Sequence, residues 1–384
     1  MIIAIDGYEA NHLNRVGIGR YAFEILKHLY EIEEKRLERN EYRIYLPSVP
    51  LSDLPKETSW WKYRVIHPRK FWTFIAFPLA LTSDMPRAHV VFSPTHYAPR
   101  FVTLPRVISI MDLSYLRYPE LFRPRDLFKL TQWTKYSAVS AKAICTISEF
   151  SRHDILHEYR VDPAAVVVTY PGISFSSTKN MDTKSSDIDV IALPKKYILS
   201  VGTLQPRKNY VRLIDAFSRL KTSHVKEYSD VSLLIVGKKG WLYDEILHSP
   251  KKYGVESSVR FLDFVEDSDL PSLYKKALCF VLPSLYEGFG LPILEAMAYA
   301  CPVVVSNVSS LPEIALGAGV YVEPENIQSI VDGIHKAIVE KQFDEGKKRI
   351  KTGLAQVKKF SWENAAKKTL EILEKVGQKG KTHE

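Results

Sequence analysis

The stretch of residues 282–298 most constrains how this 384-residue chain can fold. An apolar run at residues 277–282 leads into it and is typical of a buried parallel strand. The chain then turns through Gly288 and Gly290, and Pro292 stands where a helix begins. The N–H groups of a helix that starts above a parallel strand form an anion site. The stretch therefore predicts an α/β protein that binds a ligand at this strand end.

Two carboxylates belong to this stretch, Glu287 on the turn and Glu295 inside the helix. Isolated glutamates in such a segment are ordinarily solvated surface residues. The complete string Glu287-Gly-Phe-Gly-Leu-Pro-Ile-Leu-Glu295, however, resembles the Glu-x7-Glu signature of retaining glycosyltransferases of family 4, which have the GT-B fold. The resemblance implies an α/β chain with two Rossmann-like domains that face each other across a cleft.

The rest of the chain has the alternation of short apolar strands and helices that is typical of parallel sheets. The expected strands are residues 2–5, 43–46, 64–66, 90–92, 107–110, 144–147, 197–202, 231–236, 259–262, 277–282 and 302–306. Residues 174–190 are rich in Ser, Thr, Asp and Lys, as in an exposed linker. With the resemblance, we expect an N-terminal acceptor-binding domain, a nucleotide-sugar-binding domain and a C-terminal helix that returns to the first domain: residues 1–190, 191–360 and 361–384.

Composition agrees with a globular enzyme that handles anions. The chain is 46% hydrophobic and 25% charged, and its net charge of +9 suits nucleotide diphosphates or acidic lipid surfaces. No apolar run reaches the roughly 18–20 residues that span a bilayer, and the N-terminus reads as a strand and not as a signal peptide. The three cysteines form no Cys-x-x-Cys pair, so no disulfide or zinc site is indicated. We expect a cytoplasmic protein, with peripheral contact at the inner face of the membrane as a further option.

Two segments of the first domain resemble parts of the family. Gly17, Gly19 and Arg20 open a helix after the first strand, where family members carry a phosphate-approaching Gly loop. A dinucleotide fingerprint is the rival reading, but its third Gly is absent. Asp112 belongs to a segment that resembles the His-Asp-Leu-Ser sequence of the family, with Met111 in place of the His. Asp112 is assigned to the catalytic site, and capping of the following turn is the structural alternative.

A second basic loop follows the strand at residues 197–202. Arg207 and Lys208 lie where α/β sheets bind ligands, at a strand end. Arg suits bidentate contact with phosphate and Lys supplies a point charge. Ordinary surface charge is the alternative, but the loop resembles the phosphate loop of the family, with Thr203 where many members have a second Arg. We assign the diphosphate of the donor to Arg207 and Lys208.

The resemblance also assigns the remaining donor contacts. Glu295 is expected to accept the ribose hydroxyls and Glu287 to face the transferred sugar. The other donor-binding residues are expected to contact sugar and phosphate through backbone N–H groups or to flank the base: Phe289, Gly290 and Leu291 for the former, and Gly237, Lys238, Phe264 and Val265 for the latter.

Asp267 and Asp269 form an Asp-x-Asp pair, which suggests a metal site. They directly precede an amphipathic segment, and acidic residues before a first helical turn complement the helix dipole. We therefore expect no metal and no cofactor, since cations and helix N-termini can replace a metal ion.

The predicted reaction is transfer of a hexose from a nucleotide-diphosphate sugar to a hydroxyl of a glycan or lipid-linked sugar, with retained configuration. GDP-mannose is favoured because the loop of Arg207 resembles that of mannosyltransferases in surface-polysaccharide assembly, and UDP-glucose is the near alternative. A nucleotide-sugar epimerase of the same fold and an inactive GT-B binding module are the rivals. No RNA-binding aromatic motif is present, so no nucleic-acid partner is expected.

Residues 60–77 combine aromatic and basic side chains and contain no acid. Part of the segment is expected in the core, because aromatic residues next to strands ordinarily pack inside. The alternative is a face that contacts an anionic membrane or a lipid-linked sugar, since apolar insertion and charge attraction act together at such surfaces.

Overall fold

The computed structural model describes residues 1–173 and 193–381, which form two compact units. Unit 1 contains residues 1–119, 124–172 and 361–384, and unit 2 contains residues 120–123 and 173–360. The predicted boundary at residue 190 and the whole predicted linker, residues 174–190, lie outside the described residues.

Unit 1 is built on a seven-stranded parallel sheet in the order β3-β2-β1-β4-β5-β6-β7. Its strands are β1 (Ile2–Asp6), β2 (Glu41–Leu46), β3 (Trp61–Val65), β4 (Val90–Ser93), β5 (Arg106–Ile110), β6 (Ala143–Thr146) and β7 (Val166–Val168). The order places β1 and β4 at the centre, so the loops that follow them open onto the middle of one sheet edge.

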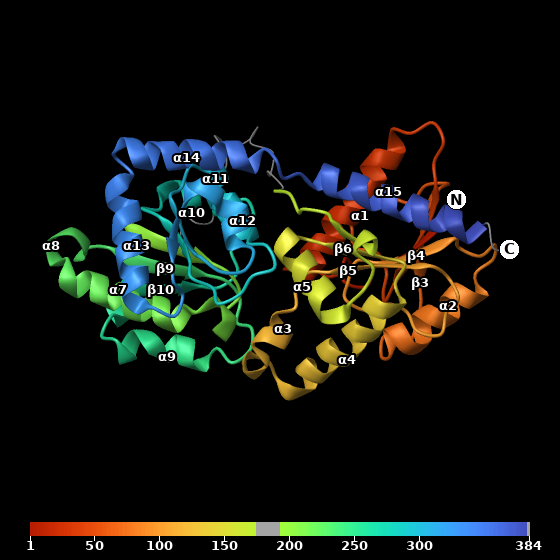
Figure 1. Ribbon diagram of the computed structural model, residues 1–384, viewed down its shortest axis with the longest axis horizontal. Helices are drawn as coiled ribbons and strands as arrows, with labels where there is room; N and C mark the ends of the chain where they lie inside the picture. The colour runs from red at the N-terminus through yellow and green to blue at the C-terminus, as the bar shows by residue number, and fades with distance from the viewer. Residues whose placement is uncertain (174–192, 382–384) are drawn as a thin grey trace. The chain divides into compact units, whose positions relative to one another are not determined.

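Figure 1 labels the α-helices of unit 1. They are α1 (Ile18–Glu34), α2 (Phe77–Ser83), α3 (Ser114–Arg117), α4 (Pro124–Ser140), α5 (Glu149–Tyr159) and α15 (Trp362–Lys381). A π-helical turn, η1 (Trp72–Ala76), precedes α2, and a 3-10 turn, η2 (Pro119–Leu121), follows α3.

Unit 2 contains a six-stranded parallel sheet in the order β10-β9-β8-β11-β12-β13. Its strands are β8 (Tyr197–Val201), β9 (Ser232–Val236), β10 (Val259–Leu262), β11 (Phe280–Leu282), β12 (Val303–Ser306) and β13 (Gly319–Val322). Its main helices are α7 (Tyr210–Ser223), α9 (Asp244–Lys252), α10 (Leu270–Lys276), α11 (Leu291–Ala298), α13 (Ile327–Glu340) and α14 (Asp344–Val357). Shorter pieces are η5 (Pro206–Lys208), α8 (Val225–Tyr228) and α12 (Leu311–Ala315).

The predicted architecture of two parallel-sheet units is confirmed, with differences at the element ends. Strands β7 and β13 were not among the predicted strands. Helix α1 ends at Glu34, earlier than the predicted end at Glu38. Glu33 explains this end, because its buried carboxylate accepts hydrogen bonds from Tyr42 Oη at 2.9 Å and from Asn40 Nδ2 at 2.9 Å. Those bonds turn the chain back toward β2.

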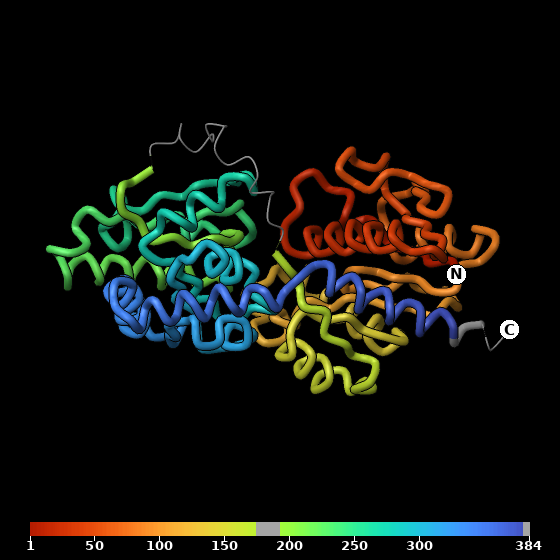
Figure 2. Tube along the Cα trace, turned by 90° about the horizontal axis from the view of Figure 1, so that it is seen from above, coloured from red at the N-terminus to blue at the C-terminus, as the bar shows by residue number. Residues whose placement is uncertain are grey.

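The C-terminal helix α15 belongs to unit 1 and runs beside α1 (Figure 1, Figure 2). Its first residue, Trp362, is only 3% exposed, and its ring lies 6.0 Å from that of Tyr21 on α1. A Cβ atom on Gly172 would lie 2.2 Å from the backbone nitrogen of Trp362, so only glycine permits this approach. Unit 1 is thus completed by the last segment of the chain.

Residues 120–123 leave unit 1 and pack in unit 2. Trp241 holds them, because its Nε1 donates to the carbonyl of Leu121 at 2.7 Å and its ring lies 5.7 Å from that of Phe122.

Among the described residues, no helix is both long enough and apolar enough to cross a membrane.

Replacing Trp362 with Ala should destabilise unit 1 strongly, because truncation of a buried indole leaves a cavity between α15 and α1. The expected loss of unfolding free energy is about 3–5 kcal/mol, measured by urea denaturation. Glu363→Ala, at an exposed position in the same helical turn, should change it by less than about 0.5 kcal/mol. Equal stability of the two variants would contradict the packing of α15 on unit 1.

Candidate active site

The predicted site residues of unit 2 lie on loops at the carboxyl edge of its sheet. They follow β10, β9, β8 and β11, which are neighbouring strands. Parallel sheets bind ligands at this edge because loop backbone and helix N-termini converge there. Arg207 and Glu287, which are eighty positions apart in the sequence, therefore lie within hydrogen-bonding distance.

Glu287 is the centre of a buried ion cluster. Its Oε2 accepts a hydrogen bond from Arg207 Nη1 at 2.9 Å, and its Oε1 accepts one from Lys208 Nζ at 2.6 Å. Ser284 Oγ donates to the same Oε1 at 2.7 Å. Arg207 also donates to the carbonyl of Tyr286. The sequence analysis assigned Glu287 and the two cations to different parts of the donor, whereas the structure joins them.

The electrostatics of this cluster suit an anionic ligand. The side chains of Arg207, Lys208 and Glu287 are 12%, 10% and 8% exposed. Burial alone would raise the pKa of Glu287, but Arg207 and Lys208, with the hydrogen bonds, lower it to about 2. The carboxylate is therefore charged at neutral pH. Two cations against one carboxylate leave these three side chains with a net positive charge at the sheet edge, as an anion site requires.

The backbone around Glu287 is fixed by two serines that follow β12. Ser309 Oγ accepts the N–H of Glu287 at 3.0 Å, and Ser310 Oγ donates to the carbonyls of Glu287 at 2.9 Å and Phe289 at 3.1 Å. Gly290 then takes a positive φ of 102° before α11 starts at Leu291. These bonds hold the loop between the ion cluster and the start of α11.

The side chain of Phe289 packs inward and does not point to a ligand. It is 3% exposed, and its ring lies 5.5 Å from that of Phe360. Phe289 can therefore contribute to a ligand site through its backbone only, and the expected donor contacts of Phe289, Gly290 and Leu291 stay predictions.

Glu295 lies on helix α11. Its Oε2 accepts a hydrogen bond from Tyr274 Oη at 2.8 Å. Tyr274 is fully buried on α10, and burial together with the charge of Glu295 raises the pKa of its hydroxyl. The hydroxyl therefore remains a donor at neutral pH and fixes the orientation of the Glu295 carboxylate.

The loops after β9 and β10 bring two predicted residues together. Lys238 Nζ lies 4.3 Å from the ring centroid of Phe264, which is 41% exposed. This distance is within the range of a cation–π contact. Gly237, which precedes Lys238, lies close to the backbone of Gly202. A Cβ atom on Gly237 would lie 2.1 Å from the carbonyl oxygen of Gly202. Val265 follows Phe264 and is half-buried.

The four predicted residues of unit 1 lie on its own carboxyl edge. Gly17 has a φ of 52° and caps α1 through its backbone, and the N–H of Gly19 donates to the carbonyl of Val16 at 3.1 Å. Arg20 Nε donates to Glu24 Oε1 at 3.1 Å. These contacts give the Gly loop a structural role within α1, and its assignment to the donor stays a prediction.

Asp112 follows β5, and its Oδ1 accepts the N–H of Ser114 at 2.9 Å. This is the capping contact that the sequence analysis gave as the alternative role. The N–H of Met111 donates to His96 Nε2 at 3.2 Å. A histidine from the loop after β4 therefore contacts the backbone at the position where relatives carry their own histidine.

Several of these contacts were missed by the sequence analysis. Ser284, Ser309, Ser310, Tyr274 and His96 bond to predicted residues or to their immediate neighbours. A partial signal exists for the pair Ser309 and Ser310, which stands shortly after the strand-like apolar run at residues 303–305. The others are ordinary in type and spacing, and only the tertiary structure brings them to the site.

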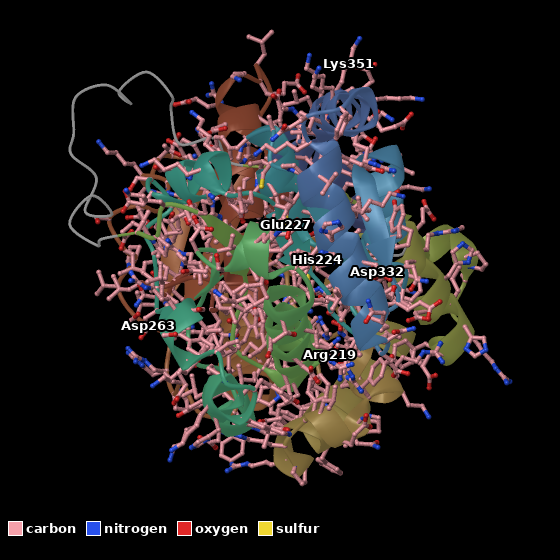
Figure 3. The ribbon with its side chains drawn as sticks, turned by 90° about the vertical axis from the view of Figure 1, so that its left-hand side faces the viewer. Arg219, His224, Glu227, Asp263, Asp332 and Lys351 are labelled. Atoms are coloured by element: carbon pink, nitrogen blue, oxygen red, sulfur yellow. The ribbon has the colours of Figure 1, made fainter. Side chains whose placement is uncertain are left out.

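No group of three or more His, Cys, Asp and Glu side chains that could hold a metal ion occurs within the described parts of the chain. Asp269 takes the N-cap position of α10, although its side chain makes no capping hydrogen bond. The rings of His224 and His335 stack at 4.2 Å on unit 2, and Figure 3 shows His224, Glu227 and Asp332 on this face. The expectation of a metal-free enzyme stays a prediction.

Comparison with known proteins extends these observations. A family model described as glycosyl transferases group 1 matches residues 182–375. O-antigen chain mannosyltransferase B of Escherichia coli is 33% identical over 383 residues, covering 92% of this chain and 94% of that protein. The solved structure of sucrose-phosphate synthase from Thermosynechococcus elongatus matches with a TM-score of 0.74 at 16% identity, over 98% of both chains. WaaG, a glycosyltransferase involved in lipopolysaccharide biosynthesis, matches with a TM-score of 0.71 at 18% identity, over 97% of this chain and 99% of that chain.

The two parallel-sheet units and these structural likenesses define the GT-B fold, as the sequence analysis predicted. The family model and the full-length similarity identify the enzyme class as well. The chain belongs to the group 1 glycosyltransferases.

Glu287→Gln should lower the free energy of unfolding at neutral pH. It should also make the free energy of unfolding fall less between pH 7 and pH 3.5. The pKa of Glu287 is depressed in the folded chain, from 4.5 to about 2, so its charge stabilises the fold by about 3 kcal/mol above pH 4.5. This contribution is lost as pH falls through 4.5 toward 2. Urea denaturation between pH 7 and pH 3.5 should show a smaller loss in the variant than in the wild type. The exposed Glu256→Gln serves as control, and identical profiles for wild type and Glu287→Gln would contradict the ion cluster.

Proposed function

We propose that this enzyme is a retaining mannosyltransferase that moves mannose from GDP-mannose to a hydroxyl of a growing surface glycan or lipid-linked sugar. The observation that carries the proposal is the net positive cluster of Arg207, Lys208 and Glu287 at the carboxyl edge of unit 2. A nucleotide diphosphate is the leaving group that such a cluster suits. The full-length similarity to O-antigen chain mannosyltransferase B supports mannose as the sugar.

The proposed reaction breaks the bond between the anomeric carbon and the β-phosphate oxygen of the donor. The acceptor hydroxyl oxygen forms a new bond to the same carbon from the face that the phosphate leaves. Its proton passes to the leaving phosphate oxygen. Arg207 and Lys208 stabilise the negative charge that develops on the diphosphate. The configuration at the anomeric carbon is retained. No metal is needed in this proposal, because Arg207 and Lys208 supply the positive charges that the diphosphate requires.

The other donor contacts follow from the loops of unit 2. Glu295, oriented by Tyr274, accepts the ribose hydroxyls, and Glu287 borders the sugar. Lys238 and Phe264 flank the base, where their cation–π contact provides a flat face. In unit 1, Gly17, Gly19 and Arg20 are proposed to bind the donor, and Asp112 is proposed to act in catalysis.

Donor identity is tested by thermal shift and by transfer. GDP should raise the melting temperature more than UDP or ADP at equal concentration, because a ligand that binds only the folded chain stabilises it by mass action. GDP-mannose should be consumed with an oligomannose acceptor, and NMR of the product should show an α-linkage. Arg207→Ala should weaken the GDP effect by about 1.5–3 kcal/mol of binding free energy, while Arg219→Ala, on the exposed side of α7, should not.

Three other outcomes would each replace the proposal. A larger shift with UDP would indicate UDP-glucose as the donor. Release of free UDP with an epimerised sugar and without acceptor would indicate an epimerase. Binding without any turnover would indicate an inactive module.

We also propose that unit 1 contacts an anionic membrane at the cytoplasmic face, through the exposed part of residues 60–77. Trp61, Trp72 and Phe77 are buried and belong to the core, in accord with the structural alternative for that part. The exposed part is a stripe at helical spacing along η1 and α2, since Phe71 is 66% and Ile75 43% exposed.

This stripe continues beyond the predicted segment and has basic neighbours. Leu79 lies one turn after Ile75 and is 63% exposed, and Arg69 and Lys70 precede Phe71 and are exposed. An apolar stripe beside cations is the pattern of interfacial helices. Each cation near an anionic surface contributes about 1 kcal/mol.

The wild type should sediment with phosphatidylglycerol vesicles at low salt and not with phosphatidylcholine vesicles. The double variant Lys70→Glu with Phe71→Ser should release it, because it removes both apolar insertion and charge attraction. Val225→Ser with Lys226→Glu, an exposed apolar–basic pair on α8, is the matched control and should stay bound. Sedimentation with neither vesicle type would leave a dissolved acceptor as the partner.

A further inference from the structure

His96 lies at the carboxyl edge of the unit 1 sheet, beside the segment that carries Asp112. It follows β4, and Met111 and Asp112 follow the neighbouring strand β5. The His96 side chain is buried, with 8% exposure. Its Nε2 accepts the backbone N–H of Met111 at 3.2 Å. The imidazole is therefore a direct support of the backbone immediately before Asp112.

This hydrogen bond determines which nitrogen of His96 carries the proton. A ring nitrogen that accepts an N–H must be unprotonated, so the neutral ring carries its proton on Nδ1. Nδ1 is buried and has no hydrogen-bond partner in the described part of the chain. A buried donor without an acceptor is costly. The unpaired Nδ1–H therefore gives no reason for a histidine at this buried position. The contribution of His96 is the acceptor atom Nε2, which binds the N–H of Met111.

The backbone around Met111 is held from three sides by side chains. Thr146 Oγ1 donates to the carbonyl of Ile110 at 2.8 Å, and Ser151 Oγ donates to the carbonyl of Met111 at 3.0 Å. His96 holds the N–H on the remaining side. Of these three bonds, only the one to His96 involves a group that changes charge between pH 5 and pH 8. A change in the charge of His96 therefore acts on the backbone immediately before Asp112.

The groups packed against His96 favour its neutral form. Burial lowers its pKa, and the nearby Asp112 raises it by a smaller amount, so the pKa lies below the ordinary 6.5. The rings of Tyr97 and Tyr115 lie 6.4 Å and 6.5 Å away, and both hydroxyls have raised pKa values, so they remain uncharged. Protonation would place an Nε2–H donor against the N–H of Met111, and the bond would be lost.

We propose that His96 is a positioning residue for sugar transfer: as a neutral acceptor it fixes the backbone of Met111 and thereby aims the Asp112 carboxylate. The proposal rests on the proposed role of Asp112 in the transfer reaction. It makes His96 the origin of an acid limb in the pH profile of kcat. Because the neutral form is required, activity is retained above the pKa of His96 and lost as pH falls through it.

Two variants of His96 distinguish its role as a hydrogen-bond acceptor from its ability to take up a charge. His96→Gln places an amide oxygen near the position of Nε2 and cannot titrate, whereas His96→Phe keeps a flat ring and removes the acceptor. His89 is the matched control, because its Nδ1 accepts the N–H of Ile2 at 2.9 Å at the opposite edge of the same sheet. His89→Asn and His89→Phe disturb a bond of the same kind far from Asp112. All variants are assayed with whichever nucleotide sugar the wild type consumes, so an error in the donor assignment does not affect the test.

At pH 7.5 His96→Gln should retain kcat within about 3-fold, and its acid limb should disappear. His96→Phe should lose 10-fold or more in kcat with the donor KM changed by less than 3-fold. The His89 variants should keep the wild-type pH profile even where their melting temperature falls. If His96→Phe does not fold, the pH profile of His96→Gln decides alone.

The tautomer supplies a readout that does not depend on turnover. Nitrogen-15 NMR of the histidine rings should contain a neutral signal with the proton on Nδ1 that disappears in His96→Gln. Signals of the same tautomer from His28 and His248, whose Nδ1 atoms face backbone carbonyls, should remain. An unchanged acid limb in His96→Gln would overturn the proposal. Inactive but folded His96→Gln would also overturn it, since the imidazole would then be needed for more than holding Met111.

Discussion

The burial of Glu287 between Arg207 and Lys208 is the constraint on which the carboxyl edge of the unit 2 sheet depends. Charges taken out of water are stable only when their partners are fixed. Asn209, with a φ of 62°, ends η5 and donates to the carbonyls of Pro283 at 2.9 Å and Pro324 at 2.7 Å. The N–H of Leu285 donates to the carbonyl of Arg207 at 2.9 Å. The loops after β8 and β11 are thereby joined by backbone as well as by charge, so the cations stay in place before any ligand arrives.

Much of this arrangement could be predicted because its signals are local. Apolar runs of strand length gave most strands of both sheets, and the Gly turn with Pro292 gave the start of α11. The spacing of Glu287 and Glu295 in one nine-residue string gave the family. The basic loop at Arg207 was assigned from its place at a strand end, and all such loops meet at one edge in a parallel sheet.

The remainder could not be predicted because it depends on partners distant in sequence. Strand β7 is only three residues long, and pairing with β6 defines it. Nothing local indicates that Tyr274 orients Glu295, or that a histidine after β4 supports the backbone after β5. The ion pair between Glu287 and Arg207 could not be predicted for the same reason. The local sequence around each residue suggests a ligand contact but contains no information about the distance between the two side chains.

Neither unit is a continuous piece of the chain, and this limits how the two units can be exchanged between related enzymes. A chimera that exchanges residues 1–172 would carry unit 1 without α15, and Tyr21 would meet a foreign helix in place of Trp362. It would also move residues 120–123 away from Trp241, with which they pack. Exchange of a complete unit therefore requires four junctions chosen together, at 119/120, 123/124, 172/173 and 360/361. A single junction between the first and second halves of the chain does not meet this requirement.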